Sequence, residues 1–154
     1  DYNMAGRTYR FATVEPLYPF GFGLSYTTFA YEGLALDHAT IRSGESVSAT
    51  VTVRNTGYRA ADEVVQLYVA DLEASVPVPQ QSLAAFRRIH LASGESRQVV
   101  FTVTPDMLEL VNDEGARVLE PGVFRLTAGG SSPSARATAL GAAAPAVAEL
   151  TVTA

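Results

Sequence analysis

The sequence contains no cysteine, no lysine and no tryptophan. Without cysteine, the chain can form no disulfide, no thiolate metal site and no cysteine nucleophile. No apolar run reaches the roughly 20 residues that a membrane-spanning helix needs, so a transmembrane protein is excluded. The net charge of −5 argues against nucleic-acid binding, because nucleic-acid binders usually carry a basic patch. We therefore expect neither a membrane nor a nucleic acid as a partner.

The composition is that of a globular protein. Hydrophobic residues make up 47% and charged residues 18% of the 154 positions, which argues against wholesale disorder. This length suits one domain of ordinary size with a tail and is short for two domains. The sequence begins at Asp1 without a charged-then-apolar leader, and it does not determine whether the protein is secreted, periplasmic or cytoplasmic.

The aromatic residues are concentrated near the N-terminus. Nine of the fourteen Phe and Tyr residues fall within the first 31 positions. Because prolines and glycines interrupt this segment, we expect neither a regular helix nor a long strand there. Rings in such numbers need a surface to lie on, so we interpret residues 1–26 as an interdomain strap from a larger protein. The expected contacts with the neighbouring domain, which would also allow self-association, are Tyr9, Phe11, Tyr18, Phe20 and Phe22.

From residue 27 onward, short runs of alternating apolar and polar residues are separated by turn residues. This pattern is typical of an antiparallel β-sandwich, and we predict one over residues 27–154. Strands are expected around residues 29–36, 47–54, 64–69, 98–103, 124–128 and 150–152. The predicted core consists of the positions that share the inward phase, namely Val51, Val53, Leu67, Val69, Phe101, Val103, Phe124 and Leu126.

Turns and loops punctuate these strands. Ser-Gly-Glu-Ser occurs at residues 43–46 and again at 93–96, each time just before an alternating strand, and predicts two tight turns. Pro105 is placed to start a helical turn, and residues 112–115 read as a hairpin turn. The prolines between residues 72 and 81 predict a loop or an edge. The Ala-, Ser- and Gly-rich segment 129–145 predicts a mobile loop.

The most specific motifs are GRTYRF at residues 6–11 and PLYPFGFGLSYT at residues 16–27. They resemble the segment of glycoside hydrolase family 3 that leaves an α/β domain and enters a C-terminal fibronectin type III-like domain. The resemblance continues through NTG (55–57), EVVQLYV (63–69), GES (94–96) and EPGVF (120–124). Departures at VPQQSLAAF (78–86) and LVND (110–113) give a slight preference for β-xylosidase-type over β-glucosidase-type members.

The resemblance implies an immunoglobulin or fibronectin type III-like sandwich and a parent enzyme that hydrolyses β-linked glycosides with two carboxylates. It places both catalytic carboxylates in domains outside this sequence, so it assigns no catalytic residue here. The parent's catalytic domains are then the expected partner. We predict that the chain alone is not an enzyme and that it needs no cofactor.

The chain's own carboxylates offer no clear replacement. The pairs Asp62-Glu63, Asp71 with Glu73, and Asp113-Glu114 lie at turns or strand ends, where a solvated surface role is expected. Glu63 fits a structural hydrogen-bonding role better than a catalytic one. His38 and His90 stand singly, without the spacing of a metal site.

Three functions remain open. The first is a non-catalytic module that stabilises a family 3 glycosidase and shapes the rim of its cleft. The second is a carbohydrate-binding module that tethers the enzyme to polysaccharide; the five dispersed aromatics after residue 31 argue against it. The third is a free-standing immunoglobulin-like adhesion domain, which leaves the aromatic extension unexplained.

Overall fold

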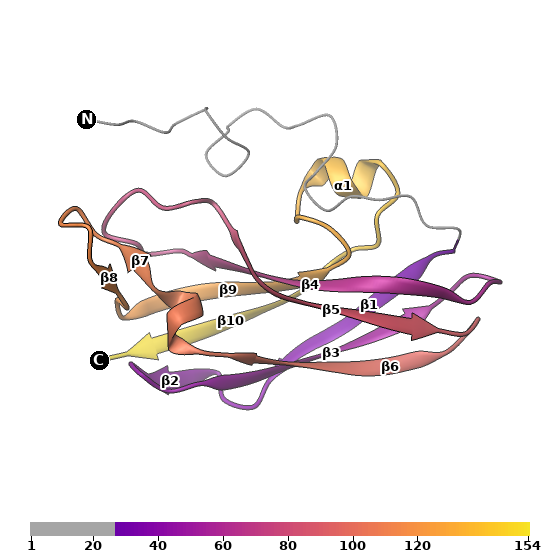
Figure 1. Ribbon diagram of the computed structural model, residues 1–154, viewed down its shortest axis with the longest axis horizontal. Coiled ribbons are helices and arrows are strands. Elements are labelled where there is room, and N and C mark those ends of the chain that lie inside the picture. The colour runs from indigo at the N-terminus through magenta and orange to yellow at the C-terminus, as the bar shows by residue number, and fades with distance from the viewer. Residues whose placement is uncertain (1–26) are drawn as a thin grey trace.

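The computed structural model describes residues 27–154, so the predicted strap over residues 1–26 and its five aromatic contacts lie outside the described residues. The described residues form strands, one 3-10 helix and one short α-helix (Figure 1). They are β1 (Phe29–Leu36), β2 (Thr40–Arg42), β3 (Val47–Asn55), β4 (Ala61–Asp71), β5 (Ser82–Leu91), β6 (Ser96–Val103), η1 (Pro105–Leu108), β7 (Leu110–Val111), β8 (Arg117–Val118), β9 (Gly122–Gly129), α1 (Ala135–Ala139) and β10 (Ala146–Thr153).

The strands form two main sheets that enclose one core. The smaller sheet has the order β1-β3-β6, and both of its pairs are antiparallel. The larger sheet has the order β2-β10-β9-β4-β5 and is antiparallel except for the parallel pair β10–β2. The short strands β7 and β8 form a separate hairpin. The predicted fold class, an antiparallel β-sandwich, is confirmed, with one parallel pair at an edge.

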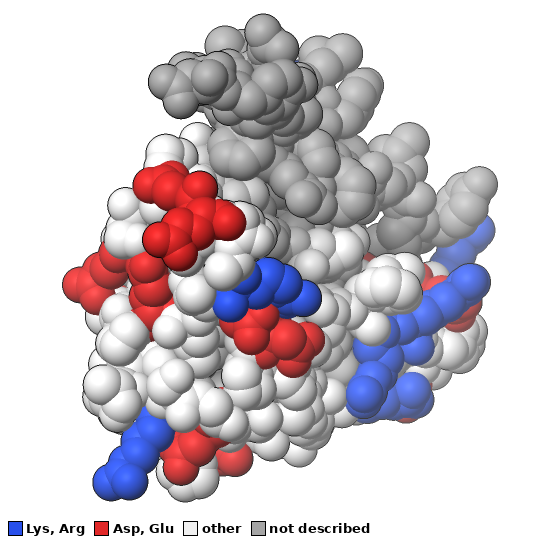
Figure 2. Space-filling view, turned by 60° about the vertical axis from the view of Figure 1, so that its left-hand side comes forward, with Lys and Arg blue, Asp and Glu red and all other residues white. Residues whose placement is uncertain are grey.

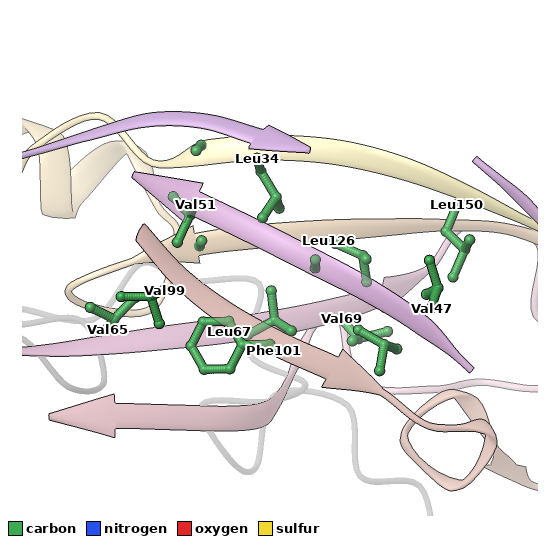
Figure 3. Packing of buried hydrophobic residues seen from close by; sticks show 14 of the residues in the cluster. Leu34, Val47, Val51, Val65, Leu67, Val69, Val99, Phe101, Leu126 and Leu150 are labelled. Carbon is green, nitrogen blue, oxygen red and sulfur yellow. The ribbon is translucent and has the colours of Figure 1, made fainter. Parts of the chain in front are cut away.

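The core lies between the inner faces of the two sheets, as Figure 3 shows for residues of β3, β4, β6 and β9. All eight residues of the predicted core are buried, and none is more than 6% exposed. Alternation explains this result, because successive side chains of a strand point to opposite faces of the sheet. In β3, for example, Val47, Ala49, Val51 and Val53 are buried and the residues between them are not.

Strand β5 was not predicted, because its sequence does not alternate cleanly. Arg87 lies opposite the buried Val65 and so takes an inward position that an apolar residue would normally fill. Its guanidinium carbon stands 6.0 Å from the centre of the Phe101 ring, at the margin of the core. A long arginine side chain can cover apolar surface with its stem while its charged end stays hydrated. Because alternation breaks at Arg87, the sequence pattern did not predict this strand of ten residues.

The two Ser-Gly-Glu-Ser turns have the same hydrogen bonds, as their repeated sequence predicted. Glu45 N donates to Arg42 O (3.0 Å), and a Glu45 carboxylate oxygen accepts from Arg42 N (2.7 Å). Glu95 and Ala92 repeat this exchange at 3.0 and 2.9 Å. The glycine before each glutamate has a positive φ, +93° in the first turn and +76° in the second, which glycine adopts at little cost.

The other local predictions meet mixed outcomes. Residues 72–81 form a loop, η1 starts at Pro105, and residues 112–115 connect the β7–β8 hairpin, as predicted. The segment 129–145, predicted to be a mobile loop, contains the short helix α1, whose first turn is capped by Ser134 Oγ accepting from Ala137 N (2.9 Å). Within residues 27–154, no helix is both long and apolar enough to span a membrane.

Candidate functional site

The β4–β5 outer face is defined by Asp62 and Val64 of β4 and by Phe86, Arg88 and His90 of β5, and it combines exposed charged, polar and aromatic side chains. His90 lies opposite Asp62 and Arg88 lies opposite Val64 across the strand pair. These residues point away from the core, because Val65 of β4 and Ile89 and Leu91 of β5, which alternate with them, are buried. Among the described strands, β5 is the last of its sheet, so this face borders an edge of the sheet.

Asp62 organises the charged part of this face. One of its carboxylate oxygens accepts a hydrogen bond from Arg88 Nε at 2.8 Å and forms an ion pair with Arg88 Nη2 at 2.6 Å, and the other oxygen lies 2.6 Å from His90 Nδ1. The hydrogen bonds from His90 and Arg88 lower the pKa of Asp62. A carboxylate held ionised in this way cannot act as a general acid at neutral pH. The surface role predicted for Asp62 is confirmed, and its contacts position Arg88 and His90.

Glu63 differs from its exposed neighbour Asp62, because it is partly buried, and a structural role is the one that the sequence predicted for it. It shares the inward phase of Val65, and burial raises the pKa of its carboxyl group. Burial, and then the nearby charge of Glu63, also raises the pKa of Tyr31, whose buried hydroxyl has no hydrogen bond of good geometry. A methyl group at Gly130 would stand 2.9 Å from a Glu63 carboxylate oxygen and 3.4 Å from the Tyr31 hydroxyl. Glu63 thus fills the space between β1 and the segment after β9.

We expect Glu63→Gln to remove a pH-dependent loss of stability. Because burial raises the pKa of Glu63, the folded state keeps this proton at pH values where the unfolded state has released it. The stabilisation from protonated Glu63 is complete below the unfolded-state pKa and is lost as the pH rises through the folded-state pKa. We therefore expect urea unfolding to show that, relative to the natural chain, the free energy of unfolding of the variant increases between about pH 4 and about pH 7.5.

Asp62→Asn is the matched control, with the opposite sign. The folded-state pKa of Asp62 is lowered, so its stabilisation is present above the unfolded-state pKa and is lost as the pH falls through the folded-state pKa. Because this loss occurs below about pH 4, the control also needs urea unfolding at about pH 2.5. Relative to the natural chain, the asparagine variant should become less stable between about pH 2.5 and about pH 7.5. An equal change of unfolding free energy at both pH values for Glu63→Gln would contradict the assigned burial of its charge.

A second group of carboxylates lies where β4 ends and β9 begins. Asp71 accepts from Glu73 N (3.0 Å), Glu73 accepts from Val123 N (3.0 Å), and Glu120 accepts from both Ser75 N (3.1 Å) and Ser75 Oγ. Burial and the charges of Glu120 and Glu73 raise the pKa of Asp71. Acidic side chains gather on the side of the molecule that Figure 2 brings forward. The contacts of this group fasten the loop after β4 to β9.

The remaining sequence-predicted residues stay apart. Asp113 and Glu114 are exposed at the β7–β8 turn, as predicted. His38 is exposed after β1, with Nδ1 3.5 Å from the carboxylate of Asp37, and His90 lies on β5, where it contacts Asp62. Among residues 27–154, no three His, Asp or Glu side chains come together in a way that would hold a metal ion.

Phe86 was missed by the sequence analysis, and it is the feature of this face that most needs an explanation. Its side chain is 68% exposed, although it lies within a ten-residue strand. The other strongly exposed aromatic residue of the described part is Tyr58, fully exposed at the turn between β3 and β4. If a strand over residues 82–91 had been assumed, the alternation of its side chains would have placed Phe86 on the outer face of the sheet.

Comparisons with known proteins agree with the fold. Residues 63–132 match the family of fibronectin type III-like domains. The chain is 45% identical over 124 residues to a β-xylosidase of Formosa agariphila, covering 80% of this chain and 17% of that protein. It is 39% identical over 133 residues to the β-glucosidase BoGH3A of Bacteroides ovatus, covering 86% of this chain and 18% of that protein. The chain therefore spans less than a fifth of the length of these relatives.

Solved structures show the same partial correspondence. A β-glucosidase of Listeria innocua in complex with gluconolactone superposes with a TM-score of 0.79 at 34% identity, over 91% of this chain and 18% of that one. The GH3 β-glucosidase of Bifidobacterium adolescentis superposes with a TM-score of 0.71 at 35% identity, over 86% of this chain and 18% of that one. The chain is thus a fibronectin type III-like module of a family 3 glycoside hydrolase, as the motifs at residues 6–27 and their continuation through the sandwich predicted.

Proposed function

We propose that this chain is the non-catalytic module of an enzyme that removes terminal β-linked xylose or glucose from oligosaccharides. In this role it stabilises the enzyme and shapes the rim of its substrate cleft. The observation that carries the proposal is the extent of the match. Relatives that are β-xylosidases and β-glucosidases align with four fifths or more of this chain through less than a fifth of their own length.

The carboxylates of the described residues support a structural role for the module. Retaining glycosidases need a nucleophile and an acid/base residue about 5–5.5 Å apart on either side of the scissile bond. Here Asp62 is held by Arg88 and His90, and Glu73 and Glu120 accept hydrogen bonds from Val123 and Ser75. Each of these carboxylates has a local partner and a local task.

The proposal extends to the aromatic N-terminal segment. We propose that residues 1–26 are the strap that joins the module to the catalytic domains, with Tyr9, Phe11, Tyr18, Phe20 and Phe22 as its contacts. The support is compositional, since the first 26 residues contain seven of the fourteen Phe and Tyr residues. Burial of several rings would fasten the module firmly, because each is worth about 1.5–3 kcal/mol when taken from water.

The isolated chain is expected to hydrolyse neither an aryl β-xyloside nor an aryl β-glucoside. The reason is that the family resemblance places both catalytic carboxylates outside this sequence, while Asp62, Glu73 and Glu120 already serve the contacts described above. Release of p-nitrophenol from both substrates by the purified chain measures this directly, with the longer enzyme as the positive control. Turnover by the isolated chain that disappears in Asp62→Asn or Glu63→Gln would show instead that the module has a catalytic site of its own.

A further inference from the structure

We propose that the β4–β5 outer face, centred on Phe86, is a surface through which this module packs against the rest of the same glycosidase polypeptide. This inference rests on the proposed function, since it names the partner of the module. It concerns described residues only and does not depend on the strap over residues 1–26.

The exposure of Phe86 is fixed by the sheet. Phe86 lies opposite Gln66, on the face away from the core, while its neighbours Ala85 and Arg87 lie opposite the inward-facing Leu67 and Val65. Turning the ring inward would require a one-residue slip of β5, which would move every side chain of the strand to the other face. The ring therefore stays 68% exposed in the module by itself.

The outer face of β4 next to Phe86 is already covered in part. Gln66 is only 6% exposed, and its Nε2 donates to Gly130 O at 2.9 Å. Tyr68, two residues further along β4, is 2% exposed and its hydroxyl donates to Gln66 Oε1. Phe86 thus stands at the border of the covered part, so a partner at this position would extend an existing contact region.

The surroundings of Phe86 have the composition of an interface. Val64, 40% exposed, adds apolar surface beside it on β4. Arg88 supplies a guanidinium group that Asp62 already holds in place through a hydrogen bond and an ion-pair contact, and His90 completes the polar rim. An aromatic centre, a positioned arginine and a polar rim are the features that carry binding energy in protein interfaces. Such a surface fits another protein surface that offers an apolar pocket and hydrogen-bond acceptors.

The partner of this surface can be inferred from how small a part of its relatives the module covers. The module spans 17–18% of the length of the β-xylosidase and β-glucosidase relatives, so most of such a polypeptide lies outside it. A domain in the same polypeptide is present at a high effective concentration, and a small patch is then enough to hold it. A second copy of the chain would need an interface of about 1,000 Å² or more to associate stably. A sugar-stacking platform would need several coplanar rings, and Phe86 is the only strongly exposed ring among the described strands.

Hydroxyl-radical footprinting of the natural sequence tests the proposal without a substitution. In the isolated chain, Phe86 and Tyr58 should both be modified rapidly, since both are strongly exposed. In the longer enzyme, we expect modification of Phe86 to slow several-fold, because a ring covered by a neighbouring domain is shielded from the radical in solvent, while Tyr58 reacts as before. Equal modification of Phe86 in the two proteins would overturn the proposal.

A substitution extends the test to stability. Phe86→Ser should leave the melting temperature of the isolated chain nearly unchanged, and in the longer enzyme it should speed thermal inactivation several-fold. Tyr58→Ser is the matched control and should change neither protein. A Phe86→Ser enzyme as resistant as the Tyr58→Ser enzyme would contradict the docking role. If Phe86→Ser abolished binding of the isolated chain to insoluble xylan, the ring would instead be a sugar-binding residue.

The proposed function and this docking surface can fail separately. Absence of glycosidase activity in the longer enzyme would refute the proposed function and leave the footprinting result unaffected.

Discussion

Replacing Phe101 with alanine is expected to lower the free energy of unfolding by about 3–5 kcal/mol, the range for a large ring removed from a packed core. Phe101 is 4% exposed and points from β6 into the space between the sheets, as Figure 3 shows. It faces Ala49 across the β3–β6 pair, and that small side chain cannot fill the space left by the ring. The substitution also removes the ring that lies beneath the guanidinium group of Arg87.

Val100→Ala is the control for Phe101→Ala. Val100 is the preceding residue of the same strand and is 44% exposed on the other face. Its truncation leaves no closed cavity, so we expect a change of less than about 1 kcal/mol. Urea unfolding of the isolated chain, followed by circular dichroism, measures both variants under identical conditions. A change near zero for Phe101→Ala, or equal changes for the two variants, would show that the ring is not packed between the sheets.

Replacing Asn55 with alanine should cost about 3 kcal/mol, because it leaves several buried groups without partners. Asn55 is fully buried at the end of β3. Its side-chain oxygen accepts from Thr27 Oγ1 (2.9 Å) and Gly57 N (3.0 Å). Its side-chain nitrogen donates to Arg59 O (2.7 Å) and Leu91 O (3.1 Å). The amide thus joins the start of the described chain, the β3–β4 turn and the end of β5.

Two further variants separate hydrogen bonding from volume at this position. Asn55→Asp has nearly the same shape but places a carboxylate oxygen against the carbonyl oxygens of Arg59 and Leu91, so we expect it to be at least as destabilising at neutral pH. Thr56→Ala removes a single exposed hydroxyl contact with Thr28 and should cost less than about 1 kcal/mol. Equal unfolding free energies for Asn55→Ala and Thr56→Ala in urea titrations would refute the central role of Asn55.

According to these predictions, two separate sites stabilise the module through different interactions. Phe101 acts through packing between the sheets, and Asn55 acts through hydrogen bonds at the end where β3, β4 and β5 meet. Neither residue belongs to the β4–β5 outer face. Variants of Phe86 can therefore report on the partner without disturbing the fold.

Local pattern alone was enough to predict much of this protein. The phase of β3, β6 and β9 follows from alternation, because each side chain's direction is set by its position along its own strand. The two Ser-Gly-Glu-Ser turns follow from residues within four positions of one another. The family, too, could be predicted from contiguous motifs, since such motifs are read directly from the sequence.

Only the tertiary structure decided the features that depend on pairing between distant segments. Strand β5 was hidden because the inward position of Arg87 is acceptable only beside Phe101, on a strand that comes later in the sequence. The sequence predicted a structural role for Glu63 but not its contacts, because Tyr31 and Gly130 lie far from it along the chain. The exposure of Phe86 and the four hydrogen bonds of Asn55 were likewise settled by register and by contacts between separate strands. Alternation tells which residues share a face, but only the assembled sheets determine what covers that face.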